Sequence, residues 1–198
     1  ADGHLAPVIR DLSIFLTAGR QTQPRNALTE AVEAERLGLR RAFLSERYDT
    51  KLTGPLLGGA AALTSRIELG SGVLAPGARH PVLTAALAAT MQAAYGERFV
   101  LGIGRGNTNW METLGLAAEP GPLGKAYSFQ AFEDYIDIMR RLWSGEVVHY
   151  DGPAGRYDGI FMADPPRCKP PQIWYGIMGG PRAAKVAARV ADGALLLD

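Results

Sequence analysis

The 198-residue chain alternates short apolar runs with longer segments whose apolar residues recur every three or four positions. The apolar runs predict buried strands at Leu12–Thr17, Arg41–Leu44, Ile67–Leu74, Phe99–Ile103, Ile173–Ile177 and Ala194–Leu197. The segments between them predict helices at Ala27–Leu37, Pro55–Leu63, Pro81–Ala94, Phe129–Trp143 and Pro181–Val190. Because the strands are apolar on both faces and are separated by helices, the pattern predicts a parallel sheet with right-handed crossovers.

Local signals add detail to this pattern. Asn26 is the expected N-cap of the first helix, and His80 is expected at the start of the third. The alternation breaks after the fourth strand, where Trp110–Lys125 is rich in Gly and Pro. Farther on, residues 147–150 and 156–161 predict a hairpin with Asp151-Gly152 as its turn. We therefore expect one domain over residues 1–198, with an insertion at about 108–170.

Unusual residues follow five of the predicted strands at their carboxyl ends. They are Gly19-Arg20, Glu46-Arg47, Gly72-Val73, Arg105–Asn107 and Gly179-Gly180. In a β/α barrel all these ends meet on the face that holds the active site, whereas an open doubly wound sheet uses one crevice. Five such ends favour the barrel.

Composition excludes several classes of protein. The 21 basic and 20 acidic residues give a net charge of +1, which does not indicate nucleic acid or an anionic membrane as a partner. The single cysteine, Cys168, excludes an internal disulfide framework, and the three histidines are isolated, so we expect no metal site. No apolar run reaches the ~18 residues of a membrane span, and the first residues lack a signal-peptide core. We expect a cytoplasmic protein without a membrane partner.

The Gly179-Gly180 pair has a second interpretation of its own. It follows an apolar strand and precedes Pro181 at the first position of a helix. Glycines let a ligand approach the backbone closely, and the helix start offers free N–H groups to a phosphate. A tight strand-to-helix turn that binds nothing has the same sequence pattern.

Three stretches of sequence resemble a known family. They are AVEAERLGLRRAFLSER, SRIELGSGVLAPGARHPVLTAALAATMQAAYGERFVLGIGRGN and PPQIWYGIMGGPRAAKVAARVADGALLL. They are similar to the bacterial luciferase-like monooxygenase superfamily, and more closely to its deazaflavin branch, which uses coenzyme F420. The resemblance implies a TIM (β/α)8-type barrel with an insertion region, of which this chain matches about six β/α units. It implies either a fragment of a longer chain or a shortened barrel that covers its open edge in another way.

The resemblance also implies roles for particular residues. Gly72-Val73 matches the non-prolyl cis peptide behind the cofactor ring, and Gly104-Arg105-Gly106-Asn107 matches the loop beside the ring and the tail. Gly179-Gly180-Pro181 matches the phosphate loop, so Arg105 and the backbone N–H groups after Ile177, including Met178, are expected to hold the cofactor tail. The side chains expected to face the substrate are Arg20, Glu46, Arg47, Asn107 and Trp110.

Two departures from the family pattern limit this transfer. Some members carry an acidic residue followed by a histidine base at the end of the second strand, and here the pair is Glu46-Arg47. Some also carry a glutamate where this chain has Asn107. Glu46, Arg47 and Asn107 stay the catalytic candidates, with Glu46 as an acid or base if burial raises its pKa. The alternative is an ion pair of Glu46 with Arg47 or Arg20.

The function that the resemblance implies is hydride transfer between coenzyme F420 and a small organic substrate, by a homodimer. Two alternatives remain open. One is an FMN-dependent monooxygenase of the same superfamily, and the other is a flavin- or deazaflavin-binding protein without catalytic activity.

Overall fold

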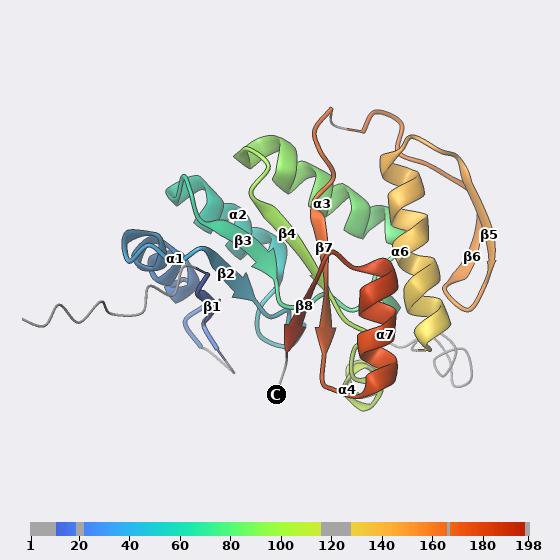
Figure 1. The fold of residues 1–198 in the computed structure, drawn as a ribbon, viewed down its shortest axis with the longest axis horizontal. Helices are drawn as coiled ribbons and strands as arrows, with labels where there is room; N and C mark the ends of the chain where they lie inside the picture. Colours follow the sequence, from blue (N-terminus) through green and yellow to red (C-terminus); the bar gives the residue numbers. More distant parts are fainter. Residues whose placement is uncertain (1–10, 19–21, 116–127, 166, 197–198) are drawn as a thin grey trace, which may run out of the picture.

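The computed structural model describes residues 11–18, 22–115, 128–165 and 167–196. Six strands form one sheet in which every pair is parallel and neighbours in the chain are neighbours in space. Figure 1 shows the sheet, with the strands in the order β1 (Ser13–Leu16), β2 (Arg41–Leu44), β3 (Glu68–Ser71), β4 (Phe99–Ile103), β7 (Gln172–Ile177) and β8 (Gly193–Leu196). The predicted parallel sheet is confirmed, and β1 and β8 are its edges.

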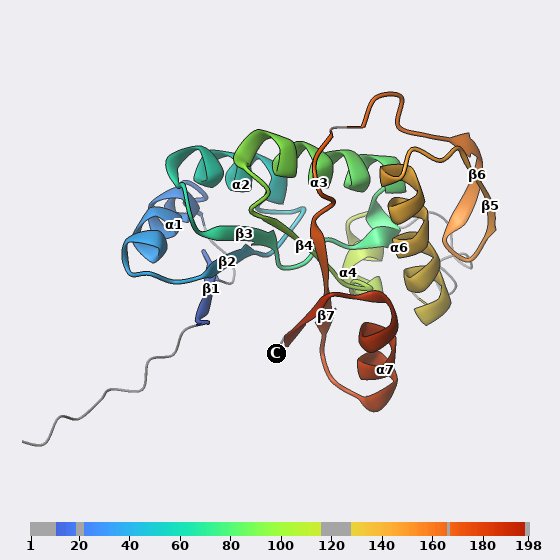
Figure 2. The ribbon, with the colours of Figure 1, turned by 45° about the horizontal axis from the view of Figure 1, so that its top comes forward.

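The helices lie along one face of the curved sheet (Figure 2). They are α1 (Asn26–Arg36), α2 (Thr53–Leu63), α3 (Pro81–Tyr95), α6 (Phe129–Trp143) and α7 (Pro181–Val190), each packed against the next. A curved parallel sheet with its helices outside is the architecture of a β/α barrel, and the six described strands form the part of that barrel that is present here.

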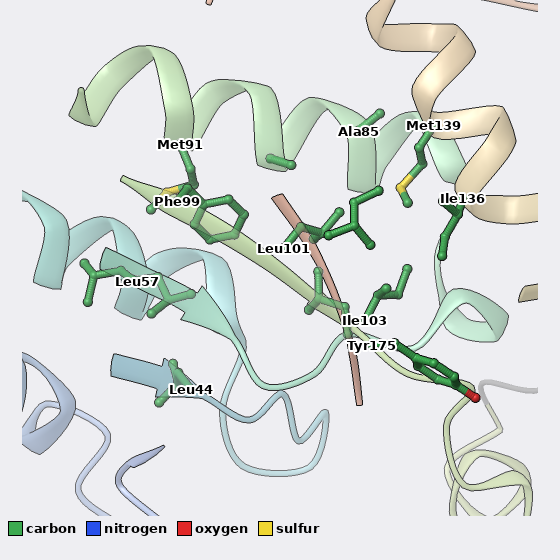
Figure 3. Close-up of a cluster of buried hydrophobic side chains, with 14 of the residues drawn as sticks. Leu44, Leu57, Ala85, Met91, Phe99, Leu101, Ile103, Ile136, Met139 and Tyr175 are labelled. Atoms are coloured by element: carbon green, nitrogen blue, oxygen red, sulfur yellow. The ribbon is translucent and has the colours of Figure 1, made fainter. Parts of the chain in front are cut away.

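Small side chains let the helices approach the strands closely. Helix α1 buries Ala27, Ala31 and Ala34, which recur at helical spacing on one face. Strand β4 is buried along its whole length, and its alternate residues Phe99, Leu101 and Ile103 pack among side chains of α3 and α6 (Figure 3). A fully apolar strand in the middle of the sheet is therefore explained by burial on both faces.

Residues 104–171 interrupt the strand–helix alternation. They contain a short helix α4 (Thr108–Thr113), helix α6 and a separate hairpin of β5 (Val148–Gly152) and β6 (Gly155–Ile160). The hydroxyl of Tyr150 donates to Asp134 Oδ2 at 2.7 Å, and this bond ties the hairpin to α6. The predicted excursion from Trp110 is thus partly helical, and its residues 116–125 lie outside the described part of the chain.

Three predictions of local structure were wrong. Asn26 is the first residue of α1 rather than its cap, and no side chain caps that helix. Helix α2 begins at Thr53, two residues before the expected Pro55. Asp151 and Gly152 belong to β5, so the hairpin turns at residues 153–154 instead. The prediction for His80 is confirmed, because its Nδ1 accepts the N–H of Val82 at the start of α3.

No helix of the described chain is both long and apolar enough to cross a bilayer.

Candidate functional site

The chain bends sharply where β3 ends. The peptide bond between Gly72 and Val73 is cis, which confirms the prediction for this pair. Beyond the bend Leu74 rejoins the sheet, because its N–H donates to Gly102 at 2.9 Å and its carbonyl accepts from Gly104 at 2.9 Å. Before the bend the N–H of Gly72 donates to the carbonyl of Leu44 at 2.8 Å, so backbone hydrogen bonds hold the bend on both sides and Val73 lies at the carboxyl edge of the sheet.

Glycines are required around this bend because other atoms occupy the space of a side chain. A Cβ on Gly72 would lie 2.5 Å from Phe15 Cε1, and one on Gly104 would lie 2.7 Å from Val73 Cγ2. A Cβ on Gly102 would lie only 1.7 Å from a backbone oxygen, that of Ser71. The G-x-G spacing of this segment thus allows two strand ends to touch.

A cavity of about 230 Å³ opens beside the bend. It brings together predicted site residues from three strand ends, and it is lined by Ser45, Glu46, Arg47, Tyr48, Gly72, Val73, Ala75, Gly106, Asn107 and Met111. Of the remaining predicted residues, Arg20 lies outside the described chain. Trp110 belongs to α4, but its side chain is outside the described part too.

Glu46 lies in the wall of the cavity with its carboxylate fully engaged. The Glu46 side chain is only 2% exposed, and its Oε1 accepts from Arg79 Nη1 at 2.9 Å. Its Oε2 accepts the N–H and the hydroxyl of Thr53 at 2.9 and 2.7 Å, at the start of α2. An ion pair was one of the two expectations for Glu46, and among the described residues its partner is Arg79 rather than Arg47, while Arg20 lies outside the described chain.

Tyr48 joins the same network. Burial is the main cause that raises the pKa of its phenol well above the usual value, and the negative charge of Glu46 adds to it. The phenol therefore stays protonated at any physiological pH, and its ring supplies part of the cavity wall.

Residues 47–51 form a tight loop after β2. The N–H of Arg47 donates to the carbonyl of Lys51 at 2.9 Å, and the N–H of Lys51 donates back at 2.7 Å. The Lys51 side chain is buried, and its Nζ donates to the carbonyl and, at 3.1 Å, to the hydroxyl of Thr17 at the end of β1. Burial lowers the pKa of Lys51, and the nearby charge of Arg47 lowers it further.

The end of β7 leads into a second part of the site. Gly179 and Gly180 have φ values of +113° and +88°, and a Cβ at either position would have no atom within 4 Å. The open loop exposes its backbone directly before the first turn of α7, where N–H groups have no partner within the helix. Ile177 is buried at the end of the strand, whereas the Met178 side chain is 82% exposed.

Two guanidinium groups flank this loop. Arg105 lies 4.0 Å and Arg182 lies 4.7 Å from the centre of the Phe129 ring, so one aromatic ring holds both cations. Arg105 Nε also donates to the hydroxyl of Tyr175 on β7 at 3.2 Å. The loop after β4 is thereby joined to the start of α7, and two cationic side chains lie at this junction.

With this geometry in place, the sequence matches the luciferase-like monooxygenase family over residues 11–198. The chain belongs to the luciferase-like monooxygenase family. Its cis bend, its G-x-G turn and its Gly-Gly loop therefore occur in the fold to which the resemblance had assigned them.

Similar proteins of this family use a deazaflavin. An F420-dependent glucose-6-phosphate dehydrogenase from Microbacterium testaceum is 33% identical over 188 residues, which are 90% of this chain and 54% of the relative. A 5,10-methylenetetrahydromethanopterin reductase from Archaeoglobus fulgidus is 31% identical over 163 residues, 82% of this chain and 46% of the relative. The solved structure of the coenzyme F420-dependent tetrahydromethanopterin reductase from Methanopyrus kandleri superposes with a TM-score of 0.76 at 24% identity, covering 94% of this chain and 55% of that one. This luciferase-like chain thus spans about half the length of the relatives that it matches.

Sequence reasoning missed three residues of the site. Arg79 and Tyr48 contact Glu46 from positions that no motif marks, so only the folded chain brings them together. Arg182 could have been found, because a basic residue directly after a Gly-Gly-Pro turn stands at the first turn of the helix.

Proposed function

We propose that this chain belongs to an F420-dependent oxidoreductase that transfers a hydride between the deazaflavin and a small organic substrate. One observation carries the proposal most strongly. A cavity beside the Gly72–Val73 bend and a positively charged, open Gly-Gly loop lie at the carboxyl edge of the same sheet. A flat ring with a phosphate-bearing tail needs both features.

The residues of the loop fit an anionic tail. Gly179 and Gly180 leave their backbone open, and α7 directs its free N–H groups and the positive end of its dipole toward the same space. Arg105 and Arg182 add two charges at fixed positions on Phe129. Among the described residues Arg182 forms no ion pair, so its charge is available to a phosphate.

The residues of the cavity fit a ring and a substrate. Gly72 lines the cavity with its backbone, and Val73 supplies an apolar contact. When bound, the deazaflavin supplies a ring carbon that accepts or donates a hydride. Arg47 and Asn107 line the same cavity and are the side chains that orient the substrate, while Met111 and Ala75 exclude water from it.

Glu46 has a different part in this proposal. Both of its oxygens already accept hydrogen bonds from Arg79 and Thr53, so it acts as a positioning residue that fixes the start of α2 and the loop after β2. Its role as an acid or base stays a prediction, and so does the expected homodimer.

The test is a binding titration of the purified chain with F420 and, separately, with FMN, followed by ring fluorescence. Gly179→Val should weaken F420 binding by about tenfold or more, which corresponds to roughly 1.4 kcal/mol, because the side chain fills the space above the loop. Gly38→Val is the matched control. Gly38 also has a positive φ, +78°, and a Cβ there would have no atom within 4 Å, but this glycine lies at the end of α1.

The outcomes separate the candidate functions. Tight F420 binding with hydride transfer supports the proposal, and F420 binding without hydride transfer from any tested alcohol to F420 supports a non-catalytic binding protein. Preference for FMN, or equal F420 affinity in a folded Gly179→Val variant, would contradict it.

A further inference from the structure

Arg47 has an uncompensated charge in the wall of the cavity. Its side chain lines the cavity, and its Nε atom is buried without a hydrogen-bond partner. Among the described residues no carboxylate forms an ion pair with it. Because the Arg47 side chain lines the cavity and no described carboxylate neutralises it, its charge can act on an anion that enters the cavity.

The other charges around the cavity do not neutralise Arg47. Glu46 is the only carboxylate among the described lining residues, and its oxygens are taken by Arg79 and Thr53. Behind Arg47 lies the buried amine of Lys51, close enough for the charge of Arg47 to lower the pKa of that amine. Glu46 is thus paired with Arg79, and the charge of Glu30 acts on Lys51, whereas Arg47 has no carboxylate partner among the described residues.

We propose that the substrate carries an oxyanion, a carboxylate or a phosphate, and that Arg47 binds it inside this cavity. The proposal rests on the proposed function, since it specifies the substrate of the same site. A guanidinium binds carboxylate and phosphate oxygens through two parallel hydrogen bonds, which a neutral alcohol or ketone cannot match.

The glycine-rich loop at α7 does not explain this charge. Arg105 and Arg182 are held on Phe129 at that loop, and neither lines the cavity that Arg47 faces. Two separate cationic positions therefore exist at the sheet edge. One suits the tail of a cofactor, and the other suits an anionic group within the cavity beside the cis bend.

The test uses the ligand-free chain with acetate and inorganic phosphate as probes, and acetamide as the neutral control. The Nε–Hε signal of Arg47 in nitrogen–proton correlation spectra should shift on titration with either anion and not with acetamide. The probe that binds more tightly shows whether the anionic group of the substrate is a carboxylate or a phosphate. Arg47→Gln should weaken binding by about tenfold or more, and Arg47→Lys should restore part of it, because lysine keeps the charge and loses the paired geometry.

The control variant is Arg156→Gln, which removes one charge from the hairpin where the Arg156 side chain is 85% exposed. It should leave anion binding unchanged. No shift of the Arg47 signal with either anion in the wild-type chain, or equal anion affinity in wild type and a folded Arg47→Gln variant, overturns the proposal. A titration with F420, run in parallel, distinguishes the two proposals. F420 binding without anion binding would refute only the proposal of an anionic substrate. Anion binding without F420 binding would refute the proposed function.

Discussion

Glu46→Gln should cost the fold measurable stability, because Glu46 anchors two parts of the chain at once. The substitution keeps the shape of the side chain but removes its charge, so Arg79 loses its ion pair and both Thr53 donors, which share Oε2, face an amide instead of a carboxylate. Removing one partner of a fully buried ion pair typically costs about 3–5 kcal/mol. The Arg79 side chain is 21% exposed, so we expect about 2–3 kcal/mol here, after partial solvation of the remaining charge.

Urea unfolding measures this loss, as a lower transition midpoint with an unchanged slope. A double-mutant cycle with Arg79→Gln isolates the pair, and its coupling should exceed about 1 kcal/mol. Glu33→Gln is the control, because the Glu33–Arg36 pair on α1 has the same chemistry with both side chains more than half exposed. It should leave the transition midpoint unchanged, because solvent screens an exposed pair.

The same variant separates the two roles considered for Glu46. A positioning role predicts that stability and turnover fall together and that Glu46→Gln keeps residual turnover under conditions in which it is folded. Complete loss of turnover in a variant with wild-type stability would refute the reasoning and would restore Glu46 as the acid or base.

Three further predictions concern other parts of the fold. Gly102→Ala should prevent folding, because its Cβ would lie 1.7 Å from a backbone oxygen, whereas Gly58→Ala on α2, with 3.7 Å to the nearest atom, should fold normally in the same expression and circular-dichroism test. Partial burial opposes ionisation of Glu35, but three backbone N–H donors outweigh it and lower its pKa to about 2. The stability that Glu35 contributes is therefore complete above about pH 4.5 and is lost as the pH falls toward 2. In acid titrations the free energies of unfolding of wild type and Glu35→Gln should become equal near that pH. Tyr150→Phe should cost about 1 kcal/mol in urea unfolding, because its hydroxyl donates to Asp134 and accepts the N–H of Ala154, and an unchanged midpoint would show that these two bonds contribute nothing.

The order of strands and helices could be predicted from the sequence because parallel strands buried on both faces are continuous apolar runs. Strand β4, Phe99–Ile103, has the same boundaries in the prediction and in the structure. The start of α2 could not be predicted, since the group that satisfies the first N–H of that helix is Glu46, seven residues earlier at the beginning of the loop between β2 and α2. Local capping rules look only at adjacent residues and therefore indicated Pro55.

Some residues of the site could likewise be predicted from the sequence and others could not. Gly72, Gly106 and Asn107 could be found because glycines and polar residues at strand ends are visible in the sequence, and the family resemblance identified the cis bond. Arg79 could not be found, because it reaches Glu46 from the segment between β3 and α3, and that contact depends on how two loops fold over one another. Long-range pairs of this kind carry no periodic signal.

The contacts of Thr17 give the open edge of the sheet a graded mobility. The N–H of Thr17 is held by Glu30 Oε2 at 2.5 Å and its carbonyl is held by Lys51, whereas the side chains of Ser13 and Ile14 at the other end of β1 are exposed. Hydrogen exchange should therefore be fast by fraying at Ser13 and slow at Thr17, where opening requires the loop of residues 47–51 to open as well. The edge strand and the loop that carries Arg47 therefore form one cooperative unit. A segment or ligand that binds beside β1 should also change the fraction of molecules in which the loop facing the cavity is open.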